Sequence, residues 1–195
     1  MIAIIDYGAS NLQSMCNALT KIAQKYEVVT QPRALTRFKK IIVPGVGAAG
    51  SAMRNLKNSG FARIIPRLQK PTLGICIGMQ LFSDFSEENE TKCLSVMPGT
   101  VKKFSGRFKV PQIGWNAVRF ETESPLAKKI GAEAFFYFVN SYYFDAPDEY
   151  VVARALYGIA FPAIVQRENF YGVQFHPEKS GSIGLQLLRN FCELC

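Results

Sequence analysis

The chain has 195 residues, a length that most simply forms one domain with a substantial core. Its composition is 48% hydrophobic, 12% aromatic and 19% charged, which excludes a disordered or fibrous chain. The net charge of +8 comes from basic residues that are scattered without a nucleic-acid-binding motif, so a solvated basic surface is favoured over a nucleic-acid site.

Targeting and metal-binding signals are weak. The first residues form a very short apolar run that is typical of a buried strand and not of a signal peptide. No run approaches the roughly 18 apolar residues of a membrane span. The five cysteines are odd in number, which argues against a disulfide framework. We therefore expect a cytoplasmic protein with no membrane segment, metal or cofactor.

Strand-like and helix-like segments alternate in the first half. The predicted elements are strands at 2–6, 26–30, 40–43 and 71–76, and helices at 10–24, from about 51, and at 77–85. Strand-like segments dominate the second half, at 96–104, 115–120, 135–144, 151–156, 163–166 and 170–175, before a last helix at 182–194. The pattern predicts an α/β fold with a mostly parallel sheet, flanked by helices and extended by antiparallel strands, in a single domain over 1–195.

Cys76 is the first candidate for chemistry. It lies within Gly-Ile-Cys-Ile-Gly at 74–78, whose small residues allow the sharp strand-to-helix turn of a nucleophile elbow. That turn places Cys76 at a helix amino terminus, where unpaired N–H groups favour the thiolate. An inert cysteine buried in a tight turn would give the same local pattern.

His176, the single histidine of the chain, is followed two residues later by Glu178. In an extended segment these two side chains face the same side, and Pro177 disfavours the helical region for His176. Glu178 is thus predicted to orient His176 as the base that a cysteine nucleophile needs. A structural histidine is the alternative.

The glycine-rich loop at 44–50 lacks the residues of a P-loop or dinucleotide site. Its predicted role is electrostatic, because acyl transfer builds an oxyanion that needs backbone N–H donors. Val46 and Gly47 are candidates for one donor, and Ile77, just after the nucleophile, for the other. An ordinary glycine turn is the alternative.

Several motifs together resemble the class I (triad) glutamine amidotransferases, and within them the glutaminase subunits of imidazole glycerol phosphate synthases. The resemblance covers nearly the whole chain. It rests on DYG (6–8), NL (11–12), PGVG (44–47), GICIGMQ (74–80), GWN (114–116), YFV (137–139), SY (141–142) and GVQFHPEKS (172–180).

This resemblance implies a flavodoxin-like α/β fold and hydrolysis of glutamine through a thioester on Cys76. Ammonia would pass to a separate (β/α)8-barrel cyclase, with which the chain would form a heterodimer. The cyclase would make imidazole glycerol phosphate and an aminoimidazole carboxamide ribotide in histidine biosynthesis. Matching positions imply that glutamine is bound by Gly45, Gln80, Asn140, Ser141 and Tyr142, and that the partner is faced by Asn11, Gln112, Trp115, Tyr137 and Lys179.

Two positions depart from the family pattern, which usually has histidine where this chain has Gln112 and Asn140. Neither belongs to the triad. The two replacements therefore put in question the coupling to the partner and the pathway that the chain serves. A related glutaminase that feeds a sugar-modifying enzyme of surface-glycan synthesis is the alternative. A cysteine peptidase of similar fold and a non-catalytic binding module are less consistent with the motifs.

Overall fold

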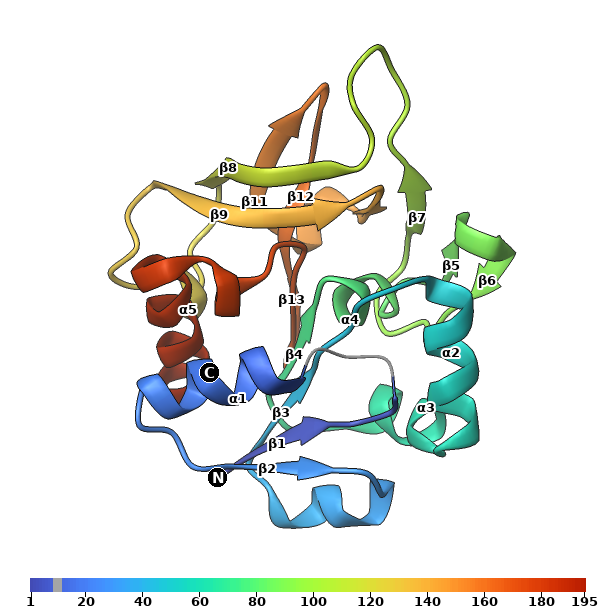
Figure 1. Cartoon of the computed structure of the whole chain (residues 1–195), viewed down its shortest axis with the longest axis vertical. Coiled ribbons are helices and arrows are strands. Elements are labelled where there is room, and N and C mark those ends of the chain that lie inside the picture. The colour runs from blue at the N-terminus through green and yellow to red at the C-terminus, as the bar shows by residue number, and fades with distance from the viewer. Residues whose placement is uncertain (9–11) are drawn as a thin grey trace.

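The computed structural model describes residues 1–8 and 12–195 and is built on a nine-stranded sheet (Figure 1). One half is parallel, with the strand order β2, β1, β3, β4, β13, which is the order of flavodoxin-like folds. Its strands are β1 (Ile2–Ile5), β2 (Tyr26–Val29), β3 (Lys40–Val43), β4 (Thr72–Ile75) and β13 (Phe170–Val173). The predicted fold class is confirmed.

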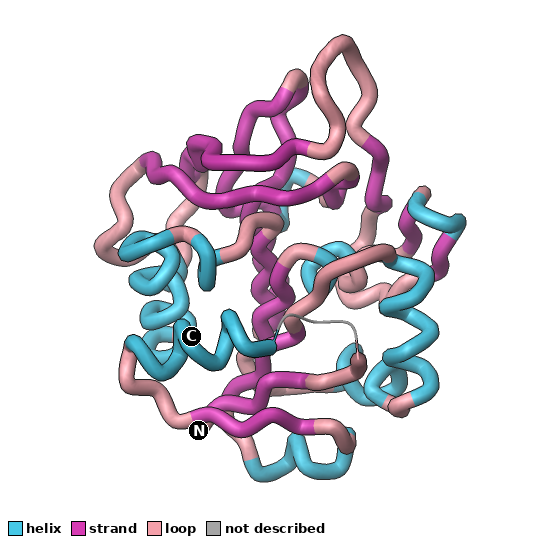
Figure 2. The backbone as a smooth tube through the Cα atoms, viewed as in Figure 1, coloured by secondary structure: helices cyan, strands magenta, loops and turns pink. Residues whose placement is uncertain are grey.

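The other half of the sheet is antiparallel and continues outward from β13. It consists of β12 (Ile159–Arg167), β11 (Val151–Tyr157), β8 (Gln112–Phe120) and β9 (Glu133–Asn140). A second, four-stranded sheet contains β10 (Tyr142–Asp145), β7 (Thr100–Lys103), β5 (Phe85–Ser86) and β6 (Thr91–Lys92). The antiparallel strands extend beyond the helices, which gather around the parallel half (Figure 2).

Helices cover both faces of the parallel strands, as short apolar strands such as β1, β4 and β13, buried along their whole length, require. Helices α1 (Leu12–Lys21) and α5 (Gly181–Leu194) lie on one side, and α2 (Ala49–Asn58) and α3 (Phe61–Ile64) on the other (Figure 1). The short helix α4 (Ile77–Gln80) follows β4. Among the described residues, no helix is both long and apolar enough to cross a membrane.

Short 3-10 helices lie in several of the connections between these elements. They are η1 (Pro32–Arg37), η2 (Ile65–Arg67), η3 (Glu88–Glu90), η4 (Pro125–Ala127), η5 (Asp148–Tyr150) and η6 (Pro177–Lys179).

The helix predicted at 77–85 is too long, because α4 ends at Gln80. The carbonyl groups of Leu81, Phe82 and Ser83 accept hydrogen bonds from the backbone of residues 94–97, so they are not free to continue the helix. Other predicted bounds also shift: α2 begins at Ala49 within the glycine-rich loop, and β7 occupies only the end of 96–104. Positions 10 and 11 of the predicted first helix lie outside the described residues.

The prediction of a single strand at 135–144 is wrong, and the break in this segment shapes the cavity over Cys76 that is described below. It divides at Ser141 into β9, which pairs with β8, and β10, which pairs with β7 in the other sheet. The carbonyl of Ser141 accepts a hydrogen bond from Phe104 N at 3.0 Å, which draws the chain toward β7. Ser141 and its neighbours consequently line a corner between two sheets.

Glycines let α4 approach the strands beneath it. A Cβ atom at Gly78 would overlap the carbonyl oxygen of Val43 in β3, and one at Gly74 would lie 2.7 Å from backbone atoms of Gly78. Backbone atoms cannot move aside without shifting the strand. Both glycines are therefore steric requirements of the turn that carries Cys76.

Gly78→Ala is accordingly expected to lower the free energy of unfolding by about 2 kcal/mol or more, since overpacking here displaces backbone. Urea denaturation followed by circular dichroism measures the change. Gly50→Ala, at a helical site with ordinary φ and a nearest contact of 3.2 Å, is the matched control and should cost much less. Equal stability of Gly78→Ala and the parent chain would contradict the packing argument.

Candidate active site

Three neighbouring parallel strands end at the same edge of the sheet, and each leads into a predicted site segment. Strand β3 leads into the glycine-rich loop, β4 into Cys76 and β13 into the segment that contains His176. Parallel α/β sheets bind ligands at the carboxyl ends of their strands. The fold thus brings together segments that are at least 26 residues apart in the sequence.

Cys76 has the backbone of a nucleophile elbow. Its φ of 54° and ψ of −111° are rare for a residue with a side chain, and such strain persists only where surrounding structure imposes it. Here the Cys76 N–H donates to the Val173 carbonyl at 2.8 Å, while α4 begins at the next residue. The sulfur is thereby held at a helix amino terminus, as the sequence predicts.

His176 and Glu178 form a buried pair. Glu178 Oε1 lies 2.8 Å from His176 Nδ1, and the two side chains are only 4% and 5% exposed. Burial lowers the pKa of His176, but hydrogen bonds with Cys76 and Glu178 and the negative charge of both raise it to about 10 overall. His176 is thus held as an imidazolium beside the sulfur, with Nδ1 fixed by the carboxylate.

Ser180 fixes the backbone around this pair. Its hydroxyl donates to the His176 carbonyl at 2.7 Å and accepts from Tyr137 N at 3.0 Å, while His176 N donates to the Tyr137 carbonyl at 2.9 Å. These bonds attach the 3-10 turn η6 to strand β9. His176 is therefore positioned by strand β9 as well as by its own segment.

The glycine-rich loop runs beside Cys76 and is tethered at its start. The buried Tyr7 hydroxyl donates to the Pro44 carbonyl at 2.9 Å, and burial together with the charge of Cys76 raises the pKa of Tyr7, so the donor keeps its proton. Gly45 packs against Tyr7 and the start of α4, where a Cβ atom would lie 2.7 Å from the hydroxyl oxygen. Gly47 has φ of 94° and open space around it.

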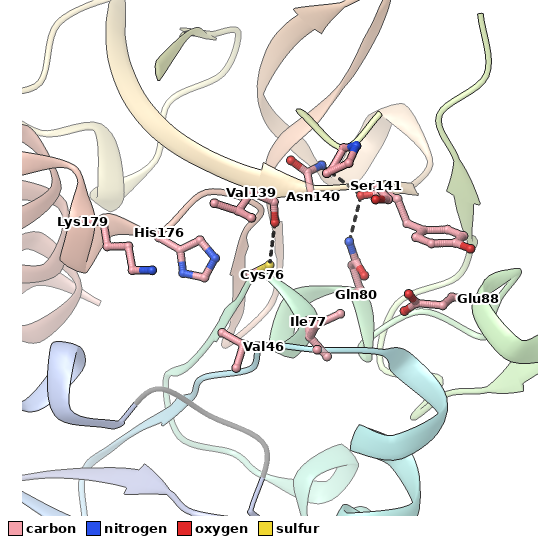
Figure 3. Close-up of a pocket in the computed structure, with 13 residues that line it drawn as sticks. Val46, Cys76, Ile77, Gln80, Glu88, Val139, Asn140, Ser141, His176 and Lys179 are labelled. Carbon is pink, nitrogen blue, oxygen red and sulfur yellow. Dashed lines mark hydrogen bonds between the residues drawn. The ribbon is translucent and has the colours of Figure 1, made fainter. Parts of the chain in front are cut away.

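A cavity of about 290 Å³ opens over Cys76 (Figure 3). The predicted oxyanion residues Val46, Gly47 and Ile77 line it together with Cys76 and His176. Four of the predicted glutamine-binding residues, Gln80, Asn140, Ser141 and Tyr142, also line it, as does Lys179. Gly45 lines a smaller hollow beneath the loop instead.

Two polar residues at the site were not singled out from the sequence. Glu88, in η3, lines the cavity and accepts a hydrogen bond from Ala49 N at 2.7 Å. Gln174 is fully buried and lies 3.7 Å from the sulfur of Cys76. Gln174 precedes His176 by two residues, so the alternation that paired His176 with Glu178 could have found it. No local signal marks Glu88.

Residues expected to face a partner divide into three groups. Trp115 and Tyr137 are register partners on β8 and β9 and pack edge-to-face at 6.2 Å, with Trp115 54% exposed. Gln112 is only 3% exposed, so its expected place on an accessible face is wrong: its side chain points inward opposite Asn140. Asn11 lies outside the described residues.

The arrangement is suited to acyl transfer at a carbonyl group. It combines a thiol at a helix amino terminus, an imidazolium held by a carboxylate, and a glycine-rich loop next to the first turn of a helix. Such a set supplies a nucleophile, a proton carrier and donors for an oxyanion.

Known proteins match the chain along its whole length. The model of the family "Glutamine amidotransferase class-I" matches residues 3–194. Two similar proteins are named imidazole glycerol phosphate synthase subunit HisH. The one from Bacillus cereus (strain ATCC 10987 / NRS 248) is 44% identical, over 98% of this chain and 93% of the relative. The one from Maridesulfovibrio salexigens is 42% identical, over 100% of this chain and 97% of the relative. A solved glutamine amidotransferase has the same fold, with a TM-score of 0.78 at 19% identity over 100% of this chain and 98% of its own. The chain belongs to the class-I glutamine amidotransferase family.

Proposed function

We propose that the chain, acting as a single domain over 1–195, hydrolyses glutamine to glutamate and ammonia through a thioester on Cys76. The observation that carries this proposal is the placement of Cys76, at a strained elbow, in one cavity with His176, whose ring is paired with the buried Glu178. The Cys76 thiolate attacks the carboxamide carbon. His176 gives its proton to the departing ammonia, then accepts a proton from water as the thioester is hydrolysed.

The cavity offers polar groups for the rest of glutamine. Glu88 supplies a carboxylate for the α-ammonium group. Gln80 Oε1 and Asn140 Oδ1 are buried acceptors without a hydrogen-bond partner among the described residues, so substrate N–H groups can satisfy them. Ser141 and Tyr142 complete this wall.

The glycine-rich loop accounts for control of the reaction by a partner. A backbone N–H of Val46 or Gly47 and that of Ile77 are the proposed oxyanion donors. Losing one such donor costs about 10²- to 10³-fold in rate. Gly47 has the open space and backbone freedom to rotate a peptide, and Val46 is 39% exposed at the mouth of the cavity, where a bound protein can contact it.

An apolar face on β8 and β9 is the proposed partner surface. Outward side chains alternate along both strands and pair across them, Ile113 with Val139 and Trp115 with Tyr137. Ile113 is 60% exposed, and Phe135 on the same face 58%. Exposed apolar patches of this kind mark protein interfaces. Lys179, exposed at the cavity, and Asn11 are further proposed contacts.

The full-length relatives named HisH support a barrel cyclase as this partner. Ammonia would pass to the (β/α)8-barrel subunit, which would make imidazole glycerol phosphate and the aminoimidazole carboxamide ribotide of histidine biosynthesis. A cytoplasmic heterodimer fits this role. These relatives favour it over the surface-glycan alternative.

Cys76→Ala should abolish glutamine-dependent synthesis by the reconstituted pair, by at least about 10³-fold, since ammonia generation needs the thiolate. Synthesis driven by added ammonium salt should persist, because that route bypasses Cys76. Product formation with each nitrogen source measures both. Loss of both activities in a folded variant would refute the proposal that Cys76 is needed only to generate ammonia.

Glu178→Gln should move the alkaline limit of glutaminase activity to lower pH. The raised pKa of His176, about 10, means that the imidazolium persists through neutral pH and is lost as pH rises through that value. Removing the carboxylate charge lowers this pKa, by about 1 unit or more. A pH profile of kcat tests the direction, and an unchanged alkaline limb would show that Glu178 does not act on the base.

Trp115→Glu should weaken binding of the barrel subunit by about 30-fold or more, because it places a charge at the centre of the apolar face. Calorimetry or analytical ultracentrifugation measures the affinity. Ile64→Glu, at an exposed apolar position of α3 on another side of the molecule, is the matched control and should bind normally. Equal affinities for the two variants would place the interface elsewhere.

A further inference from the structure

Gln174 follows strand β13 and contacts the sulfur of Cys76. Its side chain is fully buried, and its Nε2 lies 3.7 Å from Cys76 Sγ, a hydrogen-bond distance for the larger sulfur atom. Two backbone bonds fix the distance: Gln174 N donates to the Ala163 carbonyl at 2.9 Å, and Cys76 N to the Val173 carbonyl at 2.8 Å.

A chain of hydrogen bonds determines which end of the Gln174 amide faces the sulfur. Gln80 Nε2 donates to the Tyr142 carbonyl and to Gln174 Oε1, both at 2.9 Å. In the flipped orientation, two NH₂ groups would meet at Gln80, and an oxygen would face the sulfur. The network therefore holds the Gln174 N–H toward Cys76.

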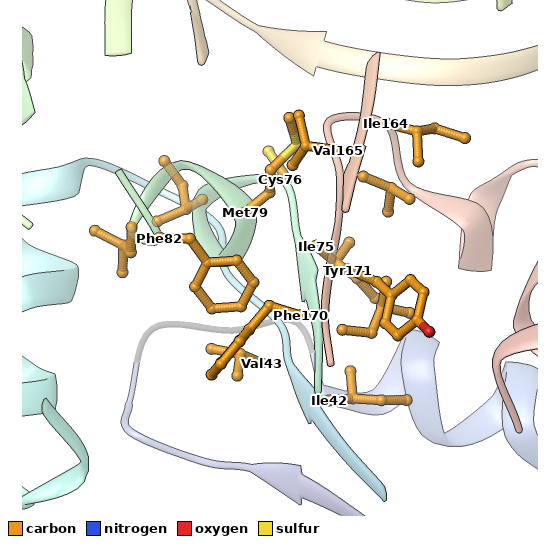
Figure 4. Packing of buried hydrophobic residues seen from close by; sticks show 14 of the residues in the cluster. Ile42, Val43, Ile75, Cys76, Met79, Phe82, Ile164, Val165, Phe170 and Tyr171 are labelled. Carbon is orange, nitrogen blue, oxygen red and sulfur yellow. The ribbon is translucent and has the colours of Figure 1, made fainter. Parts of the chain in front are cut away.

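The sulfur needs such a donor. Cys76 is 5% exposed and belongs to the apolar cluster that includes Met79 and Val165, so water can do little to stabilise an ionised sulfur (Figure 4). The Val139 carbonyl, 4.0 Å away, accepts from the thiol but repels the thiolate. Hydrogen bonds to ionised groups in such surroundings are the strong ones.

We propose that Gln174 is a further catalytic residue, whose N–H stabilises the Cys76 thiolate before attack and again when the sulfur leaves the thioester. The proposal rests on the proposed role of Cys76 as nucleophile. The hydrogen bond from Gln174 is strong to the charged sulfur and weak to the neutral thioester sulfur. It therefore favours both formation and regeneration of the thiolate.

Gln174 and His176 then act at the sulfur in different ways. His176 exchanges a proton with ammonia and with water during the cycle, and is neutral for part of it. Gln174 moves no proton, so its hydrogen bond is available at every step in which the sulfur carries charge.

Alkylation of Cys76 by iodoacetamide, followed by peptide mass spectrometry across pH, tests the proposal on the full chain. In Gln174→Met, which keeps length without a donor, the pH midpoint of alkylation should rise by about 1 to 2 units. Glutamate release should fall about 10- to 100-fold, the range for losing a hydrogen bond to a charged group.

The alkylation midpoint separates this role from a merely structural one. If Gln174 served only to position Gln80, Gln174→Met would slow glutamate release but leave the midpoint at the parental value. Gln174→Glu keeps an acceptor for Gln80 but replaces the donor with a carboxylate that repels a thiolate, so its midpoint should rise at least as far as that of Gln174→Met. Gln166→Met is the matched control: Gln166 is half-buried on β12 and bonded to Ser124, and its replacement should leave the midpoint unchanged.

Parental midpoints in both folded Gln174 variants would overturn the proposal. If either variant fails to fold, NMR of the parent chain decides: the Gln174 side-chain NH₂ signals should titrate together with Cys76 and shift on its alkylation, and unresponsive signals would overturn the proposal too. Alkylation requires no glutamine hydrolysis. A chain that alkylates as expected but never releases glutamate, with the barrel subunit present, would contradict the proposed function and not the role of Gln174.

Discussion

The hydrogen bond from Cys76 N to the Val173 carbonyl, 2.8 Å long, holds the turn at Cys76 to the strand that leads to His176. It extends the parallel pairing of β4 with β13, in which Ile75 is the register partner of Val173. The left-handed backbone of Cys76 is costly by itself, so the fold must impose it. The contact of Gly78 with Val43 closes the turn from the other side, leaving little room for Cys76 to relax.

The two halves of the sheet make different contributions to one site. Parallel strands supply Cys76, His176 and the glycine-rich loop, because their carboxyl ends share an edge. The antiparallel half supplies the opposite wall through β9, whose Asn140 lines the cavity while Tyr137 packs with Trp115 on the outer face. Since the backbone of Tyr137 also bonds to His176 and Ser180, one strand joins the proposed partner surface to His176.

Neutral amide side chains surround the buried pair of His176 and Glu178. Gln80, Asn140 and Gln174 provide donors and acceptors without adding charge near the pair of His176 and Glu178. Gln112 and Asn140, which replace the family's usual histidines, face each other across β8 and β9. Because both are buried amides, which do not titrate, His176 is the single imidazole that can carry a proton in this chain.

Strand alternation and small flanking residues are local signals, and they predict the parallel fold, the elbow at Cys76 and the facing of His176 and Glu178. Long-range packing, in contrast, sets the end of β9 before Ser141, the place of Glu88 at the cavity, and the contact of Gln174 with a sulfur 98 positions away in the sequence. The reason is physical. A side chain's direction follows from its own segment, whereas its neighbour depends on strand order and register, which are set by packing across the whole sheet.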